Sequence, residues 1–194
     1  GLGGQEAKLA GTSFAQNGVA VRANVAVPAT GSVKAGVQRA LATHPQVLFI
    51  GTGSGATGAT IVKAAKEAGF SGTFLGGNAM NSDKTAALTG EAGVGARSAS
   101  AWYLRNDFPA NSAFVTAYQQ TYGSRPDQFA TQAYVGVQSL ADALQRANVG
   151  TSTKPIAAKR TLLQRALPGV ALLTPLGPFR FTAEHDVSQI VWIL

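Results

Sequence analysis

The sequence predicts an α/β protein in which a doubly wound, largely parallel sheet is flanked by helices. Over residues 1–104, short apolar runs typical of buried strands alternate with segments of helical periodicity, which is the signature of a parallel sheet. Glycines and Pro28 separate the segments. The 194 residues are 45% hydrophobic and 13% charged, which suits a compact globular chain rather than a disordered one.

The central strand of this pattern is expected over residues 46–51, where Val47-Leu48-Phe49-Ile50 forms an uninterrupted apolar run. A glycine-rich turn follows it. From Ala59 to Ala68, apolar and charged residues then fall on opposite faces of a helix. The unit is therefore a strand, a turn and a helix.

The same reasoning predicts the other elements of the first half. They are a helix over 1–16 with an apolar stripe of Leu2, Leu9, Ala10 and Phe14, a strand over 19–27 stopped by Pro28, a helix over about 32–43, strands over 73–76 and 96–104, and a short helix from Asn81 or Ser82 to Leu88. The strands near 19–27, 46–51, 73–76 and 96–104 should pair in one largely parallel sheet with helices on both faces.

The pattern changes after Trp102-Tyr103. Helices are expected over about 110–122, 127–147 and 155–167, followed by strands over 170–173, 179–181 and 187–194. These shifts predict three parts: an α/β lobe over 1–104, a helical segment of a neighbouring lobe over 105–168, and strands over 169–194 that return to the first part.

Composition excludes several classes of protein. The chain has no cysteine, so disulfides and thiolate metal sites are impossible. Its net charge of +7 comes from scattered basic residues without the interleaved aromatics of a nucleic-acid-binding surface. The densest basic group, Lys154, Lys159, Arg160 and Arg165, is typical of a solvated helix face. No apolar run approaches the roughly 20 residues that span a bilayer.

The candidate binding site is the turn after the central strand. In an open parallel sheet, ligands bind beyond the carboxyl ends of the strands, where backbone N–H groups and a helix N-terminus are directed. Thr52, Gly53 and Ser54 occupy this turn, and Asn78 follows the next strand. We expect these four residues to contact a ligand.

The segment from Gly53 to Gly58 also matches the G-x-G-x-x-G pattern of dinucleotide-binding enzymes. A nicotinamide- or flavin-dependent Rossmann oxidoreductase is therefore an alternative. About twenty residues further on, however, such enzymes use an acidic residue for the ribose, and this chain has Asn78. We predict that the turn cradles no pyrophosphate and lines an open cleft.

Catalytic chemistry is not predicted. The two histidines, His44 and His185, lie far apart in the sequence, and Ser54 is not in a G-x-S-x-G elbow. No metal site, cofactor or catalytic residue is expected. Tyr103 and Tyr134 are further candidate ligand contacts, although core packing is the better explanation for aromatic residues at such spacing.

Several stretches together resemble type I periplasmic solute-binding proteins, in particular the second lobe of the branched-chain amino-acid receptors of ABC importers. They are Val47 to Gly53 with the helix ending in Ala65-Lys66-Glu67-Ala68-Gly69-Phe70, Phe74-Leu75-Gly76-Gly77, Phe114 to Tyr118 with Tyr122-Gly123 and Pro126, Ala133-Tyr134 with Gln138-Ser139-Leu140, and Phe179-Arg180-Phe181-Thr182 with Asp186. Their order runs along nearly the whole chain.

The resemblance implies two α/β lobes joined by three crossovers, with a small solute held in the cleft between them. It implies a non-catalytic, exported periplasmic protein that captures an amino acid or organic acid and delivers it to an ABC-transporter permease. The family's first half, including most of the first lobe, is expected to be missing from this chain and to be a partner of it. A cytoplasmic or receptor-attached sensor domain with the same binding fold is a further alternative, and an export signal in the expected N-terminal part would distinguish the importer component from it.

The resemblance also assigns roles to the predicted site. The family's cleft residues fall on Thr52, Gly53 and Ser54. The acidic residue that holds a solute's ammonium group in amino-acid receptors falls on Asn78. Because an amide lacks the full charge that holds an ammonium group, we expect a neutral or anionic solute.

Overall fold

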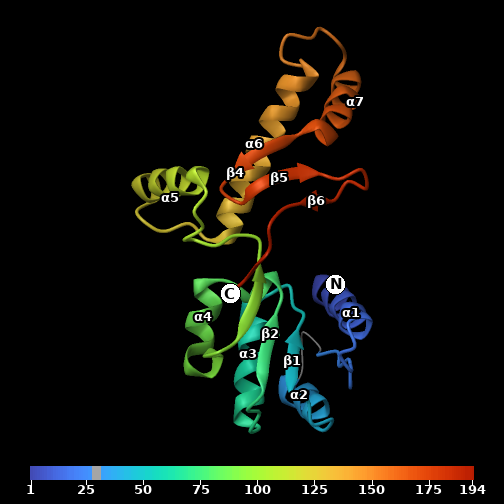
Figure 1. Ribbon diagram of the computed structural model, residues 1–194, viewed down its shortest axis with the longest axis vertical. Helices are drawn as coiled ribbons and strands as arrows, with labels where there is room; N and C mark the ends of the chain where they lie inside the picture. Colours follow the sequence, from blue (N-terminus) through green and yellow to red (C-terminus); the bar gives the residue numbers. More distant parts are fainter. Residues whose placement is uncertain (28–31) are drawn as a thin grey trace. The chain divides into compact units, whose positions relative to one another are not determined.

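The computed structural model describes residues 1–27 and 32–194. The chain forms two compact units, Gly1–Ser100 with Ile193–Leu194 and Ala101–Trp192, each with its own apolar core. Figure 1 shows the succession of elements along the chain. Pro28, which was expected to stop a strand, lies outside the described residues.

The first unit is built on a four-stranded sheet. Its strands follow the order β1 (Val47–Ile50), β2 (Thr73–Gly76), β3 (Arg97–Ser100) and β7 (Trp192–Ile193). β1 pairs with β2 and β2 with β3 in parallel, with Ile50 opposite Gly76 and Gly76 opposite Ser98. The predicted parallel sheet is confirmed for these three strands, and their carboxyl ends reach the same edge.

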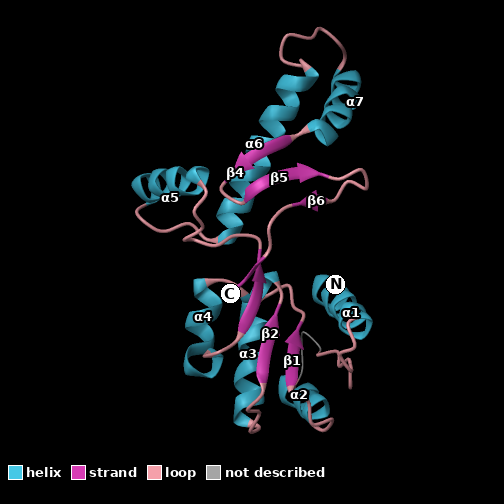
Figure 2. Ribbon diagram, viewed as in Figure 1, coloured by secondary structure: helices cyan, strands magenta, loops and turns pink. Residues whose placement is uncertain are grey.

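Helices cover both faces of this sheet (Figure 2). Ile50 of β1 packs in the core with Val37 of α2 (Val33–Leu41) and Val62 of α3 (Gly55–Glu67). Phe49 points to the opposite face, because neighbouring strand residues alternate. Its ring contacts Phe14 of α1 (Leu2–Gln16), with 5.8 Å between the ring centroids. The doubly wound arrangement is therefore confirmed.

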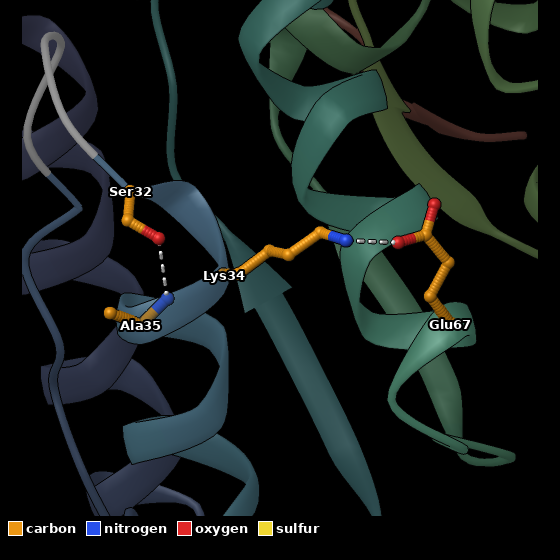
Figure 3. Close-up of polar contacts among 4 residues, drawn as sticks. All are labelled: Ser32, Lys34, Ala35 and Glu67. Atoms are coloured by element: carbon orange, nitrogen blue, oxygen red, sulfur yellow. Dashed lines mark hydrogen bonds and ion pairs between the residues drawn. The ribbon is translucent and has the colours of Figure 1, made fainter.

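Figure 3 shows a side-chain cap at the start of α2 and an ion pair between α2 and α3. Ser32 caps α2, its Oγ accepting a hydrogen bond of 3.2 Å from the backbone N–H of Ala35. Lys34 of α2 then reaches Glu67 of α3, with 2.9 Å between Nζ and Oε2. Both side chains are well exposed, so this ion pair contributes little stability.

The prediction of a strand over residues 19–27 is wrong. The segment forms no regular structure, and β1 is the edge strand of the sheet on that side. Its alternating valines favour an extended backbone, but a strand is stabilised only when its ladder and one face find partners. Val19 and Val21 remain 52% and 48% exposed.

Two short helical elements of the first unit follow the carboxyl end of β2. A single turn of 3₁₀-helix, Asn78–Met80, follows β2, and α4 (Asp83–Thr89) comes next. Ser82 caps α4 by accepting from the N–H of Thr85 at 3.0 Å, and it is one of the two cap positions that were expected, Asn81 or Ser82.

The second unit combines three helices with a small antiparallel sheet. The helices are α5 (Pro109–Tyr122), α6 (Gln128–Ala147) and α7 (Ile156–Ala166), and the strands are β4 (Ala171–Thr174), β5 (Gly177–Phe181) and β6 (Val187–Ser188). Its core joins Trp102 to Val135 of α6 and to Leu176 and Phe179 of the β4–β5 hairpin. Within residues 1–27 and 32–194, no helix has the length and hydropathy needed to cross a bilayer.

The expected return of residues 169–194 to the first part occurs only at the end of the chain. Ile193 and Leu194 belong to the first unit, where Leu194 and Ser98 exchange two backbone hydrogen bonds of 2.8 and 3.0 Å. The strands β4, β5 and β6 stay in the second unit, where Phe179 of β5 packs with Trp102 and with Val135 of α6, and β4 and β6 both pair with β5.

Candidate functional site

Four of the predicted ligand contacts lie together beyond the carboxyl ends of the strands of the first unit's sheet, and this end of the sheet is called the sheet edge below. β1 and β2 are paired in register up to Ile50 and Gly76, so the residues that follow them emerge side by side. These are Thr52, Gly53 and Ser54 after β1 and Asn78 after β2. A Cβ built on Gly55 would lie 3.0 Å from the carbonyl oxygen of Ala79, so the two turns touch.

Thr52 braces the turn after β1. Its side chain is buried, and its Oγ1 accepts from the N–H of Ser54 and lies the same 3.1 Å from the Ser54 carbonyl oxygen, to which it donates. This local ring of hydrogen bonds is a typical turn motif for threonine. The hydroxyl is therefore committed to the turn, and the exposed groups at this place belong to Gly53 and Ser54.

Ser54 is the N-cap of α3. Its Oγ accepts from the N–H of Thr57 at 3.4 Å, and the helix begins at Gly55 rather than at Ala59 as predicted. The hydroxyl hydrogen of Ser54 stays available to donate to a bound group, since the cap uses only the oxygen.

The glycines of the G-x-G-x-x-G pattern have a packing role. A Cβ on Gly55 would overlap the hydroxyl of Thr85, and a Cβ on Gly58 would overlap the sulfur of Met80. Both glycines lie inside α3 and let the helix approach the segment that follows β2. Close helix packing thus accounts for two of the glycines that suggested a dinucleotide fingerprint.

Asn78 opens the 3₁₀ turn after β2 and is half-buried. Its carbonyl oxygen accepts from the N–H of Asn81 at 3.2 Å. Met80, two residues further on, covers Gly76 and Gly58, which places the turn firmly over the end of β2. Asn78 is therefore at the sheet edge, beside the turn that carries Ser54.

A fifth residue, Glu6 of α1, lies at the same place and was not predicted. Its Oε2 accepts from the backbone N–H of Thr52 at 3.1 Å, and its carboxylate covers the Cα of Gly77 so closely that a Cβ there would overlap it. One carboxylate thus bridges the ends of β1 and β2. Within the described residues, Thr52 N–H is the only hydrogen-bond donor to it.

The position of α1 explains how Glu6 arrives there. Gly3 and Gly51 meet backbone to backbone, and a Cβ on either would lie 2.6 Å from the other's carbonyl oxygen. The predicted apolar stripe is correct for Phe14 but wrong for Leu2 and Leu9, which are 69% and 71% exposed. In its first two turns, the side of α1 that faces the sheet carries the small residues Gly3 and Ala7 together with Glu6. An acidic residue between small residues is the sequence signal that could have indicated this contact.

Tyr103 and Tyr134 belong to the second unit, and each packs on another aromatic ring. The ring centroids of Tyr103 and Trp192 are 5.6 Å apart, and those of Tyr134 and Phe114 are 4.7 Å apart. Tyr134 is 43% exposed on α6, so part of its ring stays accessible. Their role as ligand contacts stays a prediction.

Metal-binding groups are sparse in the part of the chain that the structure describes. No three histidine, aspartate or glutamate side chains there lie close enough to hold a metal ion. His44 and His185 both have positive φ angles, 50° and 68°, and occupy turns.

Comparison with known proteins finds one matching family and several proteins of similar structure. A family model described as periplasmic binding protein matches residues 2–194. A leucine-binding protein from Thermotoga maritima has a similar structure, with a TM-score of 0.79 and 21% identity over 94% of this chain and 50% of that one. No curated protein sequence matches the chain significantly.

Two further structures of similar fold carry ligands. A solute-binding protein of an ABC transporter from R. palustris, in complex with benzoate, has a TM-score of 0.79 and 20% identity over 99% of this chain and 57% of that one. A branched-chain amino acid transporter substrate-binding protein from Streptococcus pneumoniae, in complex with isoleucine, has a TM-score of 0.71 and 17% identity over 87% and 46%. The chain spans about half the length of these proteins.

Proposed function

We propose that this chain, which belongs to the periplasmic binding protein family, is part of the solute-binding component of an ABC-type importer. In this role it captures a small organic solute, such as an amino acid or an organic acid, and releases it unchanged. The observation that supports this best is that Ser54, Asn78 and Glu6 all lie just beyond the carboxyl ends of the paired parallel strands β1 and β2.

The chemistry of this edge supports binding rather than catalysis. It offers a hydroxyl, an amide and a carboxylate, which together donate and accept hydrogen bonds to a polar solute. Among the described residues, the Ser54 hydroxyl is bonded to the backbone N–H of Thr57 and to no side-chain base that could activate it as a nucleophile. The ligands named for the similar structures, benzoate and isoleucine, are small organic molecules of the proposed kind.

The proposal includes two macromolecular partners and a location. A membrane permease would receive the solute, and the protein would work in the periplasm, as the family name implies. A further part of the same protein, corresponding to the other half of its longer relatives, would cover the apolar face of the second unit. That face is formed by Val137, Leu140 and Leu144 of α6, which are 68%, 45% and 40% exposed.

A thermal-shift screen tests the function. The protein, in a form long enough to supply both lobes, is heated with separate amino acids, aromatic acids, short carboxylates and NAD. A ligand at one hundred times its dissociation constant should stabilise the fold by about 2.7 kcal/mol, which raises the melting temperature by several degrees. Stabilisation by one solute class and none by NAD supports the proposal.

Two outcomes would contradict it. Stabilisation by NAD alone would favour the Rossmann oxidoreductase. Binding of a solute by a protein whose sequence continues into a signalling domain would favour the sensor, and the importer role would then be wrong although the binding site is right.

A further inference from the structure

We propose that Glu6 is a specificity-determining residue whose carboxylate binds a cationic N–H group of the solute and repels anionic groups. This inference rests on the proposed function and names the charge of the solute group that the sheet edge accepts. It reverses the expectation of a neutral or anionic solute, which depended on Asn78 alone.

The first argument is the position of the carboxylate. Glu6 is contributed by α1, yet its oxygens lie at the ends of two strands, with Oε2 bonded to Thr52 N–H at 3.1 Å and the carboxylate over Gly77. The residue after Gly77 is Asn78, and the cap of α3 follows Thr52 by two residues. The carboxylate therefore lies among the groups proposed to contact the solute.

The second argument is the unused capacity of this carboxylate. An ionised carboxylate can accept about four hydrogen bonds. Glu6 accepts one from the described residues and has no ion pair among them, where the two pairs present are Lys34 with Glu67 and Arg146 with Asp142. A half-buried carboxylate with one partner is stabilised by any further donor, and a cationic donor forms the strongest hydrogen bond.

The third argument is that the backbone is shaped around this side chain. The contact between Gly3 and Gly51 brings the first turn of α1 against the strand end, and Gly77 leaves the space that the carboxylate fills. An acid that merely faced solvent would need neither contact. A purely structural role, in which Glu6 only secures Thr52 N–H, is the competing explanation, and it does not depend on the charge.

The experiment uses nuclear magnetic resonance titration of the isotope-labelled 194-residue chain with benzylammonium and with benzoate, which match in size and differ in charge. The amide signals of Thr52 and Gly77 report on the site. We expect benzylammonium to shift both signals to saturation and benzoate to leave them unchanged up to concentrations about tenfold higher.

Glu6→Gln separates the two explanations, because glutamine keeps an oxygen for Thr52 N–H and loses the charge. We expect it to weaken benzylammonium binding at least about tenfold, with the melting temperature nearly unchanged. Glu91→Gln, which removes an exposed carboxylate from the same unit, should leave the binding unaltered. Glu6→Asp keeps the charge and should keep the preference for the cation, and it serves as the second variant where Glu6→Gln does not fold.

The inference is overturned if benzoate shifts the two amides as strongly as benzylammonium, if neither probe shifts them, or if Glu6→Gln binds benzylammonium as the native chain does. These results concern the charge preference alone. The solute screen described above decides the proposed function separately, since a solute of any charge that stabilises the protein would uphold it.

Discussion

Gly77 lies directly beneath the Glu6 carboxylate, so a single methyl group at this position decides where that charge can sit. The overlapping atoms are the far end of a flexible side chain, which can move aside. The backbone at Gly77 has a φ of −86°, which alanine adopts without strain. The position therefore controls the site more than the fold.

Gly77→Ala should displace the Glu6 carboxylate and weaken benzylammonium binding several-fold, while the free energy of unfolding changes by no more than about 1 kcal/mol. The titration described for Glu6 measures the first quantity and urea denaturation the second. Gly4→Ala on α1 is the matched control, because a Cβ there meets no atom within 4 Å. Unaltered binding by Gly77→Ala would show that the carboxylate position does not matter.

Asn78 gives a second prediction for single residues. If its amide contacts the solute, Asn78→Ala should weaken solute binding by about 1–3 kcal/mol, since a buried polar partner is left unpaired. Folding should barely change, because the residue is half-buried at the sheet edge and not in the core. Calorimetry with a solute found in the screen measures the affinity, and equal affinity of variant and native protein would remove Asn78 from the site.

At the scale of elements, Ser54 is both the N-cap of α3 and a proposed ligand contact, so the start of this helix is part of the site. Ser54→Ala removes the cap of this helix and should lower the free energy of unfolding by about 1 kcal/mol. Ser71→Ala, at an exposed loop position of the same unit, should change it by less than about 0.5 kcal/mol. Urea denaturation compares the two, and an unchanged midpoint for Ser54→Ala would show that the 3.4 Å contact contributes nothing.

The elements also show what a sequence can and cannot predict. The βα alternation predicts β1, β2 and α3, because local periodicity and strong apolar runs define them. Periodicity fails over residues 19–27, since it carries no information on whether a strand finds a partner. Glu6 could not be placed for a similar reason: its contact with Thr52 joins residues 46 positions apart, and only the folded backbone brings them together.

At the scale of the whole molecule, the second unit leaves an apolar face without cover among the described residues. Val137, Leu140 and Leu144 lie on one side of α6, whereas Val135 and Ala143 on its other side are buried. Leu173 of β4 is 83% exposed in the same unit. Faces of this kind usually bind another protein segment, and we have proposed that a further part of the same protein binds here.

Val137→Lys tests this proposal. In the 194-residue chain the substitution should change the free energy of unfolding by no more than about 0.5 kcal/mol, because the side chain is 68% exposed there. In a longer protein that includes the covering part, the same lysine would be buried without a partner, and the loss should reach about 2 kcal/mol or more. Gln145→Lys adds the same charge at an exposed polar position of α6 and should be tolerated in both proteins. Urea denaturation of the four variants gives the comparison, and an equal effect of Val137→Lys in the short and the long protein would mean that this face stays open to solvent.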